Sequence, residues 1–185
     1  MAIKSIIFKA QLQIADMDRY YYADHALTVA LHPSETEERM MVRMVAFAIF
    51  ADEALVFGKG LSDDDEPDLW QKDLTGAVER WIMVGLPDER LIRKATGRAR
   101  QVVVCCYGRT ADMWWNDNHS KLSRLDNLTV LRLPVESTQA LKQLVSRTMQ
   151  LQCTIQESHI MMTSEGGMVE IEPEIWQGSL PSAQT

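Results

Sequence analysis

Residues 62–100 decide the predicted fold: they contain SDDDEPDLW at 62–70, AVERWIMVG at 77–85 and PDERLIRKATGRAR at 87–100. These stretches predict an acidic loop, a strand of alternating pattern and a helix with many basic residues. A magnesium site for phosphodiester hydrolysis needs carboxylates on adjacent elements and a cation beside them. The order of these elements is therefore typical of a metal-dependent nuclease site.

Four side chains are candidates for that site. Asp68, Glu38 and Glu79 are the expected ligands of a Mg²⁺ ion. Lys94 is expected to stabilise the attacking hydroxide or the phosphate charge, so that Glu38, Asp68 and Lys94 form the expected catalytic set. Pro67 restricts the backbone before Asp68 and helps to hold that carboxylate in place.

The predicted strand lacks one acidic residue that a nuclease would carry. Glu79, Trp81 and Met83 alternate onto one face of the strand. Met83 occupies the position where a second strong ligand is wanted, and a thioether is too soft a ligand for Mg²⁺. The sequence therefore favours a nuclease-like ancestry more firmly than a nuclease activity.

The predicted helix after this strand carries a basic stripe. Arg90, Lys94 and Arg98 follow one another at four-residue spacing, which suits contacts to nucleic-acid phosphates. Acidic residues at the start of a helix and basic residues at its end also suit the helix dipole, which is an alternative explanation of the pattern. The net charge of −7 argues against a protein that coats nucleic acid. The acidic run 63–66 is interpreted as a solvated surface.

Residues 35–52 predict the first helix, because Ser34 and Glu37 stand at capping-box spacing. Glu38 shares its face with apolar residues and points toward the core, either as a functional carboxylate or as a glutamate at the core rim that favours the helix dipole. On the other edge, residues 35, 39 and 43 step by four and are expected to pair on the solvent side.

The remaining pattern predicts an α/β (α+β) fold with one mixed β-sheet flanked by helices. The expected organisation is a single domain over residues 1–177 and a C-terminal tail over 178–185, since 185 residues suffice for one core. Strands 3–14 and 25–31 predict an N-terminal hairpin, and strands 160–163 and 168–171 predict a C-terminal hairpin. Between them we expect strands 101–107 and 127–133 and helices 109–119 and 137–147.

Targeting signals are not recognised in the sequence. The N-terminus has no uninterrupted apolar region, and the longest apolar stretch, residues 40–51, is too short and too charged to span a membrane. Three cysteines give neither a disulfide framework nor metal-ligand spacing, so Cys105 and Cys106 are interpreted as core residues. We therefore expect a cytoplasmic protein without membrane contact.

Five motifs, HPSETEERMM, GLSDDDEPDLW, WIMVGLPDERLIRKA, MWW and QLQCTIQ, occur in this order over nearly the whole chain. In these motifs the sequence resembles the YaeQ family of bacterial proteins. The resemblance implies a variant of the PD-(D/E)XK nuclease fold. It matches Glu38 to the acid on the first helix, Asp68 to the acid after proline and Lys94 to a lysine moved from strand to helix. Glu79 matches a further acidic position, whereas the acid after Trp-Ile is replaced by Met83.

Two hypotheses about function follow. The first is a Mg²⁺-dependent phosphodiesterase, or nuclease, acting on DNA or RNA. The second is a catalytically degenerate module that binds nucleic acid or a protein and has a regulatory role. A purely structural interaction protein is a third reading, which salt-dependent binding of nucleic acid would exclude. The sequence identifies no protein partner.

Overall fold

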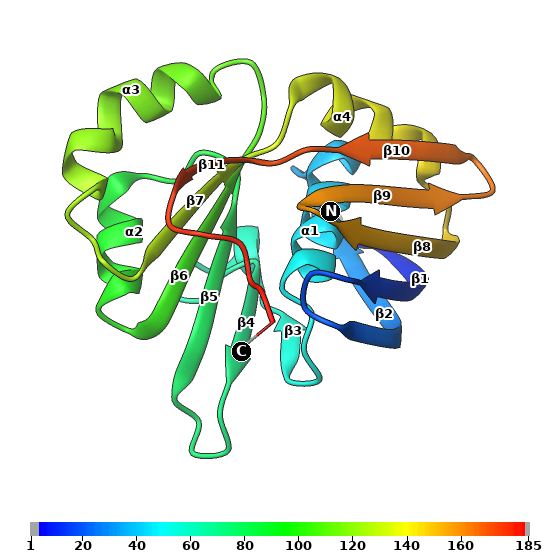
Figure 1. Cartoon of the computed structure of the whole chain (residues 1–185), viewed down its shortest axis with the longest axis horizontal. Helices are drawn as coiled ribbons and strands as arrows, with labels where there is room; N and C mark the ends of the chain where they lie inside the picture. The colour runs from blue at the N-terminus through cyan, green and yellow to red at the C-terminus, as the bar shows by residue number, and fades with distance from the viewer. Residues whose placement is uncertain (1–3, 184–185) are drawn as a thin grey trace.

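The computed structural model describes residues 4–183, which form two β-sheets on either side of a single helix, α1 (Glu37–Ile49) (Figure 1). Helices α2 (Glu89–Thr96) and α3 (Ala111–Leu122) cover the far face of the second sheet. The mixed α+β class is confirmed. The expected single sheet is instead two sheets, because α1 is buried on every side from Met40 onward and needs cover on both.

Helix α1 is the centre of the larger core. Every residue from Met40 to Ala51 is buried, including Arg43. Its N-cap is Thr36, whose hydroxyl accepts a hydrogen bond from the Arg39 amide at 3.1 Å. The expected cap at Ser34 is wrong, because the Ser34 hydroxyl bonds to His32 instead and the helix begins later.

The first sheet, sheet A, has its N-terminal strands at one edge and its C-terminal strands at the other. Its order is β10-β9-β8-β1-β2, with β1 parallel to β8 and the other neighbours antiparallel. Both predicted hairpins are confirmed, as β1–β2 and β9–β10. The strands are β1 (Ile6–Asp16), β2 (Tyr21–Leu31), β8 (Thr148–Gln156), β9 (His159–Ser164) and β10 (Gly167–Ile171).

The second sheet, sheet B, has the order β11-β7-β6-β5-β4-β3. Its central strands β5, β6 and β7 are parallel, as the alternation of strands and helices predicts. The shorter fourth helix, α4 (Val135–Ala140), continues as a 3₁₀ turn over 141–144, so the predicted helix 137–147 is shifted and ends early. The strands are β3 (Leu55–Phe57), β4 (Leu69–Lys72), β5 (Val78–Val84), β6 (Ala99–Cys106), β7 (Leu128–Arg132) and β11 (Glu174–Gln177).

Strand β6 is buried on both faces, as its continuous apolar sequence predicts. Val103 and Cys105 face α1, whereas Val104 and Cys106 face α2 and α3. The prediction that both cysteines are core residues is confirmed. Burial, with a smaller effect of Asp68, raises the pKa of Cys105 to about 12, so this thiol stays protonated.

Within residues 4–183, no helix has the length and apolar composition that crossing a bilayer requires.

The C-terminal end of α1 is buried and is capped by an arginine from the hairpin β1–β2. Arg19 donates to the Ala51 carbonyl at 2.8 Å and to the Ala48 carbonyl at 3.3 Å. The same guanidinium pairs with Asp16 at 2.7 Å, and Asp16 is only 2% exposed. Arg19 therefore supplies donors for one buried carbonyl in the last turn of α1 and for another just after the helix.

Replacement of Arg19 by Met keeps the apolar stem but removes these donors and leaves a buried carboxylate at Asp16. We expect Arg19→Met to lower the free energy of unfolding by about 2–4 kcal/mol, measured by urea denaturation. The matched control is Arg124→Met at an exposed arginine, which should change stability by less than about 0.5 kcal/mol. Equal stability of the two variants would contradict the capping role.

Candidate functional site

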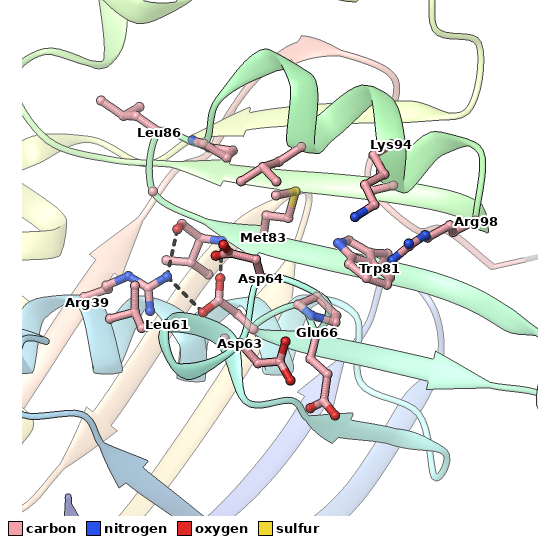
Figure 2. A pocket seen from close by; sticks show the side chains of 18 residues that line it. Arg39, Leu61, Asp63, Asp64, Glu66, Trp81, Met83, Leu86, Lys94 and Arg98 are labelled. Atoms are coloured by element: carbon pink, nitrogen blue, oxygen red, sulfur yellow. Dashed lines mark hydrogen bonds and ion pairs between the residues drawn. The ribbon is translucent and has the colours of Figure 1, made fainter.

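A cavity of about 350 Å³ lies at the carboxyl end of β5, between α2 and the loop that precedes β4. Figure 2 shows Arg39 at one side of this cavity, and Lys94, Arg98 and Trp81 at the other. Crevices at the carboxyl ends of parallel strands are common ligand sites. Its charged lining residues are Arg39, Asp63, Asp64, Glu66, Asp68, Lys94 and Arg98, and its larger apolar ones are Leu61, Trp81, Met83, Leu86 and Leu91.

Asp68 is buried at the edge of this cavity, and both of its carboxylate oxygens have partners. One oxygen accepts from the Arg39 guanidinium at 2.8 Å, and the other accepts from the Val84 amide at 2.8 Å. The pairing of β4 with β5 ends at Leu69 and Ile82, and the Asp68 side chain then accepts from the Val84 amide, two residues further along β5. This carboxylate thus completes the sheet edge and neutralises an arginine.

The Arg39 guanidinium continues into a buried network. Its other nitrogen donates to Glu35 at 2.6 Å, and Glu35 accepts two further bonds from Arg43. Arg43 also donates to the Ala30 carbonyl of β2 at 2.8 Å. The predicted pairing of these three residues is confirmed, but the solvent-side location is wrong, since Glu35 is 9% and Arg43 6% exposed.

The protonation of Arg39 follows from these contacts. Burial lowers the pKa of its guanidinium, but the charge of Asp68 and hydrogen bonds to Glu35 and Asp68 outweigh burial and raise that pKa overall. Arg39 is therefore a permanent cation, and its charge offsets the charge of Asp68.

The loop before β4 folds back tightly on Asp68. The Gly58 amide donates to the Asp68 carbonyl at 3.0 Å, and the Gly60 amide donates to the Pro67 carbonyl at 3.1 Å. Gly60 has a φ of +50°, and a Cβ there would lie 2.6 Å from an Asp68 carboxylate oxygen. Only glycine fits this approach, which sets the acidic residues 63–66 beside the cavity.

Lys94 and Arg98 reach the acidic loop from the opposite side. The Lys94 ammonium lies 3.3 Å, and the Arg98 guanidinium 3.6 Å, from the same oxygen of Asp65. A hydrogen bond to Lys94 and then the charges of Lys94 and Arg98 lower the pKa of Asp65. All three side chains are substantially exposed, so these ion pairs contribute little to stability.

The other predicted site residues lie elsewhere. Glu38 accepts a hydrogen bond from Thr138 of α4, and Glu79 pairs with Arg100 near the start of β5. Neither carboxylate lines the cavity with Asp68, and Glu79 is separated from Met83 by about 13 Å of strand. Arg90 is exposed on α2 outside the cavity. Among the described residues 4–183, no group of three His, Cys, Asp or Glu side chains is arranged to hold a metal ion.

The three expected magnesium ligands therefore do not form a shared coordination shell as they lie here. Lys94 and Asp68, by contrast, do line one cavity, and Arg98 and Met83 join them there.

Sequence reasoning missed Arg39, Asp65 and the indole group of Trp81 as parts of this site. The apolar run on both sides of Arg43 was the available signal for the first of these, since it predicts that Arg43, and with it the edge that Arg39 shares, faces the interior. Asp65 gives no local signal, because its partners follow it by 29 residues and more.

Comparison with known proteins gives consistent matches along the chain. A family model described as YaeQ protein matches residues 1–173. YaeQ from Escherichia coli strain K12 is 42% identical, and YaeQ from Salmonella typhi 43% identical, each match covering 96% of this chain and 98% of the relative. The crystal structure of YaeQ from Xanthomonas axonopodis pv. citri superposes with a TM-score of 0.92 at 47% identity, covering 95% of this chain and 99% of that chain. YaeQ from Pseudomonas syringae gives 0.91 at 34% identity, covering 95% and 97%.

The Asp68→Asn variant tests whether this carboxylate serves as the partner of Arg39. We expect a loss of about 2–3 kcal/mol in the free energy of unfolding, because Arg39 keeps Glu35 but loses its second counter-charge. Chemical denaturation of the variant measures this, with Asp64→Asn at an exposed loop position as the control. A carboxylate held ready for a metal among other acids would behave in the opposite way, and its neutralisation would stabilise the metal-free protein.

Proposed function

We propose that this chain, which belongs to the YaeQ family, binds nucleic acid on a nuclease-like fold, a variant of the PD-(D/E)XK type. In this proposal Asp68 does not take part in hydrolysis of the nucleic acid. One observation carries this proposal: Lys94 and Arg98 converge on a single anionic oxygen, that of Asp65. Two cations on one anion form an arrangement that a phosphate group also fits.

The contact with Asp65 is suited to exchange. Its side chain is 71% exposed, and those of Lys94 and Arg98 are 50% and 44% exposed. Because exposed ion pairs are weak, a phosphate oxygen can take the place of the Asp65 carboxylate at little cost. Arg90 stands one helical turn before Lys94 and extends the basic stripe for a second phosphate.

The environment of Asp68 supports binding without hydrolysis. A magnesium ligand must offer carboxylate oxygens to the ion, whereas those of Asp68 are engaged by Arg39 and by the Val84 amide. The arginine also supplies the positive charge that an ion would bring. Asp68 therefore acts as a positioning residue for the loop and for α1 in this proposal.

The salt dependence of binding tests the basic stripe. We expect wild-type protein to bind single-stranded oligonucleotides with an affinity that falls as salt rises. The Lys94→Gln and Arg98→Gln variants should each reduce the slope of log K against log salt by about 0.7, the value for one phosphate contact on a single strand. Fluorescence anisotropy at several salt concentrations measures this. Lys142→Gln, at an exposed lysine in the turn after α4, is the control.

Asp65→Asn is the complementary test of the same contact. This change removes the anion that Lys94 and Arg98 now share, so affinity for the strand should rise severalfold. Unchanged affinity in Asp65→Asn together with unchanged slopes in the other two variants would contradict a phosphate site between Lys94 and Arg98.

A magnesium-dependent phosphodiesterase acting on DNA or RNA is the second candidate. It is favoured by the position of Asp63, Asp64, Asp68 and Lys94 around one cavity. Calorimetric titration with Mg²⁺ or Mn²⁺, up to millimolar metal, separates the two candidates. Our main proposal predicts that wild type and Asp68→Asn give the same heat of metal binding. Binding that is present in wild type and lost in the variant would favour the second candidate and would direct work to cleavage assays.

A further inference from the structure

The indole group of Trp81 has a hydrogen-bond donor that the fold leaves unused. Trp81 is 6% exposed, and its Nε1 atom is buried without a hydrogen-bond partner among the described residues. An indole nitrogen only donates, so no rotation converts it into an acceptor. A buried donor of this kind costs stability unless a ligand or water accepts from it, which makes it a marker of a binding site.

The position of this donor is fixed by packing. Trp81 stands on β5, where its ring meets Trp70 edge-on at 5.8 Å with an interplanar angle of 83°. It belongs to the core cluster that includes Ile92 and Ala95 of α2. Figure 2 shows the indole nitrogen on the same side of the cavity as the Lys94 ammonium. The N–H group is therefore held beside the cavity, and because its nitrogen is covered, a ligand can accept from it only when the side chains over it move aside.

The other walls define what the cavity can accept. Met83, Leu86 and Leu91 give apolar surface, and Asp63 and Asp64 give hydrogen-bond acceptors from the loop. A ligand that suits these walls is partly apolar, carries one acceptor for the indole N–H and has N–H donors for carboxylates. Nucleobases meet these requirements, because their flat faces are apolar and their edges carry both hydrogen-bond acceptors and N–H donors. The volume of about 350 Å³ lies within the range of small-molecule sites.

We propose that the cavity takes up a single nucleobase of a bound strand, with an acceptor atom of the base on Trp81 Nε1–H and the adjoining phosphate on Lys94 and Arg98. This inference rests on the proposed function and adds a recognition element to it. Unpaired bases are the natural occupants, because no base-pairing energy is lost when they enter a pocket. The Trp81 N–H then contributes to the affinity for the base, whereas Lys94 and Arg98 contribute to the affinity for the phosphate.

The test compares two strands of equal length, one of natural nucleotides and one built entirely from abasic units. Wild-type protein should bind the natural strand more tightly. In Trp81→Phe, which keeps an aromatic ring but removes the N–H, that preference should fall by about tenfold, while affinity for the abasic strand should stay unchanged. Trp115→Phe is the control, since Trp115 does not line the cavity and its ring stacks on Trp114 and Trp176 on the far side of sheet B.

A second readout uses wild-type protein alone and so does not depend on the folding of the variant. The indole N–H resonance of Trp81 should shift when nucleoside monophosphates are added in an NMR titration, whereas that of Trp115, which stacks on Trp114 and Trp176 outside the cavity, should stay in place. Salt-dependent binding with no preference for bases and no shift at Trp81 would overturn the base pocket and leave the proposed function standing. Absence of salt-dependent binding to either strand would overturn both.

Discussion

A buried chain of charges joins the two sheets of this protein. It runs from a carbonyl of β2 through Arg43, Glu35, Arg39 and Asp68 to an amide of β5. Each charged group meets an opposite charge and additional hydrogen bonds, which is the condition under which buried charges are tolerated. Because α1 carries both arginines, the helix fixes the distance between sheet A and sheet B along with their orientation.

The cavity follows from this arrangement. Asp68 is immobilised by Arg39, Gly60 folds against Asp68, and the acidic loop is thereby placed opposite α2. Lys94 and Arg98 lie outside the buried network, and within residues 4–183 their ion pairs are with one exposed carboxylate, that of Asp65. One side of the site is thus held rigidly by the buried ion pair of Arg39 and Asp68. On the other side, Lys94 and Arg98 can exchange their carboxylate partner for the proposed phosphate.

The sequence predicted local features well and pairings distant in sequence poorly. Hairpins, the parallel strands β5 to β7 and the buried cysteines could be predicted, because turns, periodicity and β-branched runs are local signals. The location of α1 between two sheets could not be predicted, since its charged residues 35, 39 and 43 have the spacing of a solvent-facing edge although Arg43 is buried. The partner of Arg39 was missed because Asp68 lies 29 residues away, on the other side of a loop.

The parallel pairing of β1 with β8 has a consequence for synthesis of the chain. Lys9 is the register partner of Thr148, so sheet A cannot be assembled until most of the chain has left the ribosome. Until then α1 has its apolar surface without the cover that β8 and β9 provide. Pairing between such distant segments slows folding and prolongs the exposure of apolar surface. The protein therefore completes its larger core late in synthesis, and a nascent chain that lacks β8 exposes apolar surface of α1.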